Sequence, residues 1–256
     1  MKNLSYRLFY VWKRNLISYK RFIVPTLLVS MGEPLFFLVT FGVGLGAYVG
    51  MIGGKSYLNF LVPGVLVSAT AIAATYECLY GTFVRMTHER LFDALCATPV
   101  SAEDAIAGEI CWGVFRGIIS GTVLIIFAII LGAFPLTLMK IILIYLLIIL
   151  SGFMFASLAM IVTAFAPNFD FFNYYSELVM TPMLFFSGVF FPLNGFPRWA
   201  NAVAQFLPMT HAIALSRAIC GGAYHLGLIL NLFVIIFLGI VFFQLALMLM
   251  KRRLIK

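Results

Sequence analysis

The 256-residue chain is 63% apolar, and only 10% of its residues are charged, with a formal net charge of +8. A soluble domain carries about 25% charged residues, so this chain has too few charges to cover a globule of its size in water. Lipid therefore solvates much of its surface, which leaves a helical bundle or a closed barrel. Barrel strands alternate in polarity over about 10 residues, whereas this chain has continuous apolar runs of helical span length. We predict an all-α integral membrane protein.

The segment 2–21 is predicted to form an amphipathic helix in the membrane interface. At about 100° per residue, its apolar and basic side chains fall on opposite arcs, as in helices that lie along lipid headgroups. It serves either as an anchor, which we favour, or as a gate that moves during transport. The apolar arc holds Leu4, Leu8, Phe9, Val11, Trp12, Leu16 and Tyr19, and the basic arc holds Lys2, Arg7, Lys13, Arg14, Lys20 and Arg21.

Six apolar segments of span length follow, and we expect the whole chain, 1–256, to form one transmembrane domain. Five spans fill residues 22–192, an outer segment follows at 193–225, and the sixth span closes the domain. The predicted spans are 22–49, 57–84, 105–133, 138–166, 171–192 and 226–250.

Lysine and arginine in the short flanks predict the orientation of the chain, because cytoplasmic flanks are enriched in both. With the N-terminus inside, twelve basic residues flank the inner ends and three flank the outer ends. Both termini are therefore predicted to be cytoplasmic, and this distribution favours a membrane face over nucleic acid as the partner of the basic residues. The outer three are Lys55, Lys140 and Arg198.

The cytoplasmic stretch 85–104 is predicted to hold a short helix on the membrane face. Leu91, Phe92 and Leu95 form its apolar side, and its charged residues face water. Pro99 ends it, because proline disfavours helical geometry at the preceding Thr98. Ser101 and Asp104 resemble an N-cap and a first-turn acid for the third span. The exposed charges are Glu89, Arg90 and Asp93.

The outer segment 193–225 is predicted to form two half-helices that re-enter or cap the outer leaflet. Pro197 and Pro208 can each start a helix, and Gly221 with Gly222 ends the second piece. Each piece is too short to cross a bilayer. The first piece spaces Trp199, Ala202, Val203 and Phe206 along one face.

Small residues repeat at every fourth position in two of the predicted spans, which permits close approach of helices. Packing within one chain and a dimer interface both remain open for these ladders. They are Gly42, Gly46 and Gly50 in the first span, and Gly113, Gly117 and Gly121 in the third.

Three acids fall within predicted spans, where charge is costly and side chains face a cavity or a partner. Glu33 lies in the first span, Glu77 in the second and Glu177 in the fifth, and Arg116 is placed to pair with Glu77 or Glu177. These groups either bind substrate or form structural pairs. Nearby tyrosines suit either sugar stacking or the interfacial belt. They are Tyr76, Tyr80, Tyr174 and Tyr175.

The sequence contains no recognisable catalytic or nucleotide-binding motif. The run from Gly53 to Ser56 resembles the end of a phosphate-binding loop, but Val49 stands where that loop needs its first glycine. We interpret the run as a turn between two spans. The sequence therefore supplies no visible catalytic machinery, and we expect neither enzymatic activity nor a cofactor bound to this chain.

Several segments resemble the ABC type-2 export permeases, most closely the subgroup that exports nodulation factors or lipooligosaccharides. The loop 85–104 resembles the coupling helix of that family. The block TPMLFFSGVFFP at 181–192, followed by LPMTH at 207–211, resembles its most recognisable motif. The subgroup is indicated by Pro63-Gly64, by AATYE at 73–77 and by AFAPNFDFF at 164–172.

The resemblance implies two copies of this chain with two cytoplasmic ATPase subunits, which hold the ATP and magnesium, in a bacterial inner membrane. The substrate would be an amphiphile with a lipid tail and a saccharide head. Coupling to the ATPase would involve Glu89, Arg90, Asp93, Leu95, Thr98 and Pro99. The substrate path would include Glu33, Tyr76, Glu77, Tyr80, Arg116, Tyr174 and Glu177, and the outer gate Trp199, Phe206 and His211.

Three alternatives remain. A drug or antibiotic exporter of the same fold would have a mostly apolar cavity. An ion-coupled carrier would use the three acids as proton sites and show inverted repeats. A membrane-embedded enzyme would need a catalytic constellation.

Overall fold

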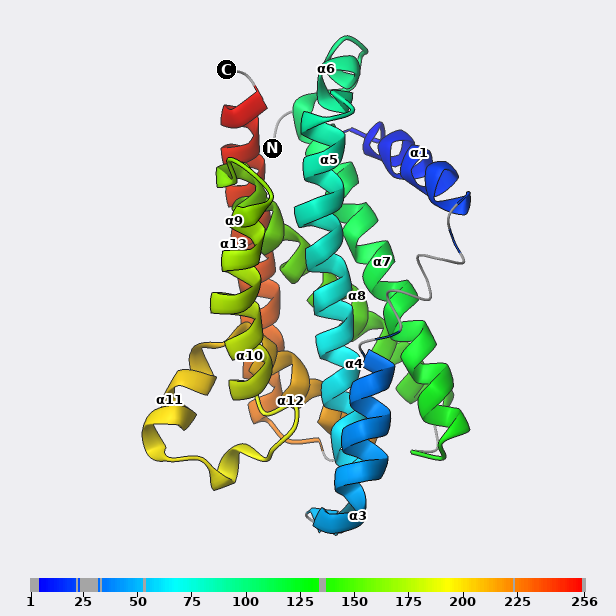
Figure 1. The fold of residues 1–256 in the computed structure, drawn as a ribbon, viewed down its shortest axis with the longest axis vertical. Helices are drawn as coiled ribbons and strands as arrows, with labels where there is room; N and C mark the ends of the chain where they lie inside the picture. Colours follow the sequence, from blue (N-terminus) through cyan, green and yellow to red (C-terminus); the bar gives the residue numbers. More distant parts are fainter. Residues whose placement is uncertain are drawn as a thin grey trace.

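The computed structural model describes residues 5–21, 23, 32, 34–52, 54–133, 137–222 and 224–254. Figure 1 shows an elongated helical bundle. Helix α6 (Leu91–Cys96) and the last turns of α13 (Gly227–Leu254) lie at one end, hereafter the α6 end. Helices α3 (Gly46–Val49) and α12 (Pro208–Gly221) lie at the opposite end, hereafter the α12 end.

Four helical stretches of the described chain are long and apolar enough to cross a membrane. They confirm the second, third, fourth and sixth predicted spans to within a few residues. The first of them is continuous through α4 (Tyr57–Tyr76), the π-helical segment η2 (Glu77–Gly81) and α5 (Thr82–Thr87); the others are α7 (Ala102–Ile130), α8 (Leu138–Phe165) and α13.

The other two predicted spans correspond to shorter helical stretches. The described part of the first is helical over Pro34–Val49. The fifth was expected to reach residue 192, but its helix ends at Phe186, because Ser187 leaves helical geometry and Gly188 has a φ of +79°. A left-handed residue of this kind ends a helix. The segments are η1 (Leu38–Leu45) and α3 in the first, and α9 (Asp170–Tyr175), η3 (Ser176–Met180) and α10 (Thr181–Phe186) in the fifth.

Helix α4 forms the centre of the bundle, and α13 lies at its edge. In the most apolar stretch of each span, 72% of the residues of α4–α5 are buried by the chain, against 22% in α13. Helix α4 packs against α7, α8, α12 and η1, and α13 packs mainly along α8. Because its remaining surface is apolar and uncovered, α13 needs lipid around it.

The second glycine ladder packs within the chain, and so does Gly42 of the first, whereas a Cβ on Gly50 would meet nothing within 4 Å. A Cβ atom on Gly113 would lie 2.6 Å from the Sγ of Cys78, and one on Gly117 would lie 3.1 Å from the carbonyl oxygen of Thr70, so α7 touches the backbone of α4 here. A Cβ on Gly42 would lie 2.5 Å from Leu58. These glycines bring helices of one subunit together, as small residues do in membrane bundles.

Helix α1 (Leu8–Lys20) confirms that the segment predicted as an interfacial helix is helical, and it packs against α7. A Cβ on Gly108 would lie 2.9 Å from the carbonyl oxygen of Leu8, which shows how closely the two helices approach. Val11 and Tyr19 of the predicted apolar arc are buried, and Phe9 of the same arc is exposed. The polar Asn15, which the prediction did not include, is also buried because it meets a buried carboxylate.

The remaining elements cap the two ends of the bundle. Ser101 caps α7 in a reciprocal capping box with Asp104, as predicted. At the α12 end, Pro197 and Pro208 begin the two short helices as expected, and Gly222 ends α12 with a φ of +69°. Besides α3 and α12, the elements at the α12 end are the antiparallel hairpin of β1 (Met51–Ile52) and β2 (Lys55–Ser56), the 3-10 turn η4 (Leu193–Gly195), and α11 (Arg198–Phe206).

We predict that Gly113→Ala lowers the thermal unfolding midpoint of the purified chain in detergent. The added methyl group overpacks the α4–α7 contact, which typically costs about 1–3 kcal/mol. Gly44→Ala is the matched control, since a Cβ there meets nothing within 4 Å. Equal midpoints for the two variants would contradict the close α4–α7 packing.

Candidate functional site

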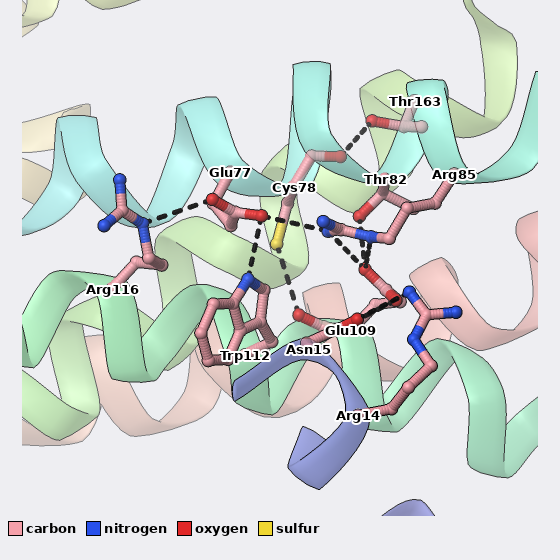
Figure 2. Close-up of polar contacts among 10 residues, drawn as sticks. All are labelled: Arg14, Asn15, Glu77, Cys78, Thr82, Arg85, Glu109, Trp112, Arg116 and Thr163. Carbon is pink, nitrogen blue, oxygen red and sulfur yellow. Dashed lines mark hydrogen bonds and ion pairs between the residues drawn. The ribbon is translucent and has the colours of Figure 1, made fainter. Parts of the chain in front are cut away.

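A buried ion network at the α6 end joins the central helices. We define the ion network as Glu77, Arg85, Glu109 and Arg116, two acids and two bases that alternate in space (Figure 2). Glu77 opens η2, Arg85 lies on α5, and Glu109 and Arg116 lie on α7. The network therefore ties the second predicted span to the third.

Arg85 bridges the two carboxylates. Its Nη2 lies 2.6 Å from the Oε2 of Glu109 and 3.0 Å from the Oε1 of Glu77, and its Nε also donates to Glu109 at 2.9 Å. The side chain of Glu109 has no exposed surface, so its charge depends on this guanidinium. Charge-assisted hydrogen bonds of this length are among the strongest in proteins.

Arg116 closes the network on the opposite side of Glu77. Its Nε donates to the Oε2 of Glu77 at 3.2 Å, which confirms the predicted pairing with one of the two acids. The indole Nε1 of Trp112 donates to the other oxygen of Glu77 at 2.8 Å. Both oxygens of Glu77 are thus held by donors from α7.

Helix α1 completes the coordination of the ion network. The Nδ2 of Asn15 donates to the Oε1 of Glu109 at 3.0 Å, and the Tyr19 hydroxyl accepts from the Nη1 of Arg116 at 2.7 Å. Arg14 donates to Asn15 at 2.8 Å. Burial lowers the pKa of the Arg14 guanidinium despite the opposing field of Glu109. Movement of α1 would therefore disturb the surroundings of both buried charges on α7.

The π-helical segment η2 brings Glu77 and Arg85 onto one face of their helix. Residues eight apart on a regular α-helix point about 80° away from each other. A π turn accommodates one extra residue, so this pair behaves like a pair seven apart, which differs by only about 20°. Gly81 lies between the two side chains, and a Cβ there would lie 2.5 Å from the Oε1 of Glu77. The missing side chain leaves room for the ion pair.

A polar pocket of about 250 Å³ opens beside the ion network, between α1 and the α4–α5 helix. Glu77 and Arg85 line its floor, and Arg14, Tyr19 and Glu89 also contribute. Glu89 is exposed and precedes α6, so the pocket connects the ion network with the short cytoplasmic helix that the sequence predicts. A change at α6 can therefore reach the buried charges over a short path.

The predicted coupling residues lie together around α6. Glu89, Arg90, Thr98 and Pro99 are exposed, and Leu95 is half-buried. Phe92 anchors the helix with 1% of its surface exposed, as expected for its apolar side. The side chain of Asp93 lies outside the described set.

Two contacts tie this segment to the N-terminal part of the chain. Arg7 donates to the carbonyl oxygen of Pro99. The amide of Ser5 donates to Asp104 at 2.6 Å. The segment around α6 and helix α1 are therefore linked directly, and not only through the ion network.

The predicted substrate-path residues divide into separate places. Glu77 and Arg116 belong to the ion network, whereas Glu177 and Tyr174 are exposed on η3 and α9. Glu33 lies outside the described residues. Tyr76 and Tyr80 lie on either side of Glu77 in the chain. Their rings meet edge to face with centres 5.7 Å apart, and the Tyr80 hydroxyl donates to Asn173 of α9 at 3.1 Å.

The three predicted outer-gate residues do not come together. Trp199 and Phe206 are exposed on α11, while α11 buries the opposite face through Ala200 and Ala204. His211 is buried on α12, where its Nδ1 lies 2.8 Å from the Oδ1 of Asn231. His211 therefore helps to hold α12 against α13.

Glu109 and Arg85 are the functional candidates that sequence reasoning missed. Arg85 counted only as a flanking charge, and Glu109 was not recognised as an acid inside a span. The available signal was spacing: Glu109, Trp112 and Arg116 recur at three and four residues, which places all three on one face of a helix.

Comparisons with known proteins agree with this architecture. Residues 6–220 match the family model described as "ABC-2 type transporter". The chain belongs to the ABC-2 type transporter family, so it is a multi-pass membrane subunit of a transporter rather than an enzyme.

The chain is similar to several curated relatives over most of its length. It is 39% identical to Nodulation protein J of Rhizobium meliloti (strain 1021), covering 85% of this chain and 83% of the relative. It is 36% identical to Nodulation protein J of Rhizobium leguminosarum bv. viciae, covering 96% and 94%. It is 26% identical to Inner membrane transport permease YadH of Escherichia coli (strain K12), covering 80% and 78%.

We predict that Arg85→Ala destabilises the chain strongly, because two buried carboxylates lose the cation between them. Removing one partner of a buried ion pair typically costs about 3–5 kcal/mol. Arg252→Ala, which removes an exposed cation from the end of α13, is the control and should change stability by at most about 0.5 kcal/mol. Thermal unfolding in detergent measures both, and equal effects would contradict the central role of Arg85.

Proposed function

We propose that this chain is the membrane subunit of an ATP-driven exporter that moves an amphipathic, lipid-linked saccharide out across the bacterial inner membrane. Two copies work with two cytoplasmic ATPase subunits, which bind the ATP and magnesium. The chain crosses the membrane six times, with both termini and the α6 end in the cytoplasm. The observation that carries this proposal is the ion network, which links the exposed α6 segment to three helices of the bundle.

The coupling step follows from the order of the contacts. Closure of an ATPase subunit would push on α6 and on Glu89 and Arg90 beside it. Only a few residues separate this segment from Arg85 on α5, so the push reaches the guanidinium that holds Glu77 and Glu109. Because α1 donates to Glu109 of α7, and α7 donates to Glu77, these helices would shift together with α5. Buried charges allow few alternative pairings, which favours two discrete arrangements over gradual deformation.

A second copy is supported by the apolar side chains that the described chain leaves uncovered. Leu178 and Val179 on η3 are exposed, as are Val39 and Val43 on η1. Such faces suit either lipid or another copy of this chain. Glu177, exposed among them, favours a partner or a water-filled path over lipid, because charge in hydrocarbon is costly. We propose that the substrate path runs along this surface, beside Tyr174; Glu33, also predicted for the path, lies outside the described residues.

The substrate class is supported by the likeness to relatives named Nodulation protein J and by the subgroup motifs in the sequence. Exposed tyrosines beside an acid suit the hydroxyl groups of a saccharide, and the uncovered apolar faces suit an acyl chain. The similarity to a relative named Inner membrane transport permease is weaker and leaves a drug exporter of the same fold as the alternative.

The first prediction from this proposal concerns the partner. We expect a tagged full-length chain, extracted in mild detergent, to co-purify with an ATPase subunit in equal amount and to show vanadate-sensitive ATP hydrolysis. An acylated oligosaccharide should stimulate that hydrolysis more than an apolar drug does. Stimulation by the drug alone would favour the alternative exporter, and transport that stops on collapse of the proton gradient, with no ATPase present, would favour an ion-coupled carrier.

The second prediction concerns coupling. We expect Glu89→Ala and Arg90→Ala together to lower ATP-dependent export into proteoliposomes by about tenfold or more, equivalent to about 1.4 kcal/mol of lost coupling. The thermal midpoint should remain unchanged because both side chains are exposed. Arg198→Ala, an exposed cation at the α12 end, is the matched control. A normal export rate in the double variant would disprove the coupling role of this segment.

A further inference from the structure

A basic pocket of about 350 Å³ lies at the α12 end, far from the ion network. Its cations come from three segments that are remote in sequence: Lys55 from β2, Lys140 from the start of α8, and Arg217 from α12. Asn59 and Phe60 of α4 complete the wall between them. The sequence predicted only three basic residues in the outer flanks, and two of these three converge in this pocket with Arg217.

Each cation is positioned by neighbouring protein atoms. The Nη2 of Arg217 donates to the carbonyl oxygens of Gly188 and Val189 at 2.5 and 3.2 Å, and its guanidinium lies 3.8 Å from the centre of the Phe60 ring. Lys140 donates to the carbonyl oxygen of Cys220 at 2.9 Å. Lys55 reaches the same helix end, since a Cβ on Gly221 would lie 2.7 Å from its Nζ.

The described residues offer these cations no acid. The nine acidic residues are all absent from the stretches 34–76, 110–169 and 178–256, which supply the whole α12 end of the described structure. No salt bridge involving Lys55, Lys140 or Arg217 occurs among the described residues. Full neutralisation of this pocket therefore needs a group beyond the part of the chain that the structure describes.

The three cations could stabilise the C-terminal end of α12, but this role accounts for only part of their positive charge. The C-terminus of a helix carries roughly half a negative charge, which favours nearby cations. Three full positive charges exceed that by a wide margin. In addition, the Nε of Arg217 is buried and has no hydrogen-bond partner in the described chain, so a donor is left unused beside the pocket. An unused buried donor favours an acceptor that binds there.

We infer that this pocket binds a phosphate group, held by Lys55 and Lys140 and by the free Nε of Arg217. Arginine suits a planar or tetrahedral oxyanion through several directed donors, and lysine contributes point charges. The pocket volume accommodates one such group together with small polar substituents. This inference is independent of the exported substrate.

Two sources can supply that phosphate: the headgroup of an anionic phospholipid in the outer leaflet, or free inorganic phosphate. The site lies at the ends of α4 and α8, which would face the headgroups of the outer leaflet in the orientation proposed above, on which this source depends. A second, apolar pocket of about 210 Å³ lies between α8, α12 and α13, lined by Leu143, Leu147, Leu215 and Ile219 among others. It shares α8 and α12 with the basic pocket, so a lipid at this end has apolar surface close to its headgroup.

Native mass spectrometry of the purified full-length chain tests the inference with phosphatidylglycerol, phosphatidylcholine and inorganic phosphate as probes. We expect phosphatidylglycerol to bind more tightly than phosphatidylcholine. Lys55→Gln combined with Lys140→Gln should weaken phosphatidylglycerol binding about tenfold, as expected if each lysine contributes about half of 1.4 kcal/mol. Arg198→Gln removes one positive charge at the same end outside the pocket, as each single lysine substitution does, and should leave binding unchanged.

The remaining outcomes separate the two sources and protect against a folding artefact. Displacement of phosphatidylglycerol by millimolar inorganic phosphate supports a site for the free anion, and retention of the lipid supports a headgroup site. Lys55→Arg with Lys140→Arg should restore binding, which a merely misfolded glutamine variant would not explain. Equal binding of both lipids together with no binding of inorganic phosphate, or equal loss in Arg198→Gln and the double glutamine variant, would overturn the inference.

Discussion

The structure depends on the need to neutralise one carboxylate that has no contact with solvent. Glu109 lies on the face of α7 that meets α1 and the α4–α5 helix, and burial of an unpaired charge there would cost several kcal/mol. Arg85 supplies the opposite charge, while Asn15 and Thr82 supply neutral donors at 3.0 and 3.1 Å. Because these groups come from α1 and α5, the contacts of a single side chain on α7 help to fix the positions of both helices.

This arrangement places the closely packed pair of α4 and α7 beside the exposed segment that carries α6. Glycine contacts hold α4 against α7 along their length, so the two helices behave as one body. By contrast, α6 is short and anchored chiefly through Phe92. The α6 end thus joins a rigid pair of helices to a small surface element, which suits the transmission of movement. The α12 end differs, since Lys55, Lys140 and Arg217 have no acidic partner among the described residues.

Much of the architecture could be predicted because its signals are local. Apolar runs gave the four long spans, and the proline and glycine positions gave the limits of α11 and α12. The capping of α7 by Ser101 and Asp104 followed from three adjacent positions. The predicted face of α11 bearing Trp199 and Phe206 is exposed, because apolar periodicity in a membrane protein does not distinguish a lipid-facing side from a packed one.

The ion network was harder to predict because its contacts are not local. Arg85 and Glu77 are eight residues apart, a separation that regular helical geometry places on different faces. Asn15 and Glu109 are separated by 94 positions, and Asn15 belongs to a segment that looks like a surface helix. Only the packing of α1 over Gly108 brings the two side chains together. The sequence predicted Glu77 and Arg116 as a possible pair, but it gave no signal that α1 packs against α7 beside them.

The wide turn at Glu77–Gly81 also affects which changes in chain length this helix tolerates. A π turn is equivalent to one residue inserted into an α-helix. Deleting one residue there would restore regular winding and leave Glu77 and Arg85 seven positions apart, still on one face. The same deletion beside Ala69 would rotate half of α4 by about 100° against α7. A one-residue change in the length of this span is therefore best tolerated at the irregular turn.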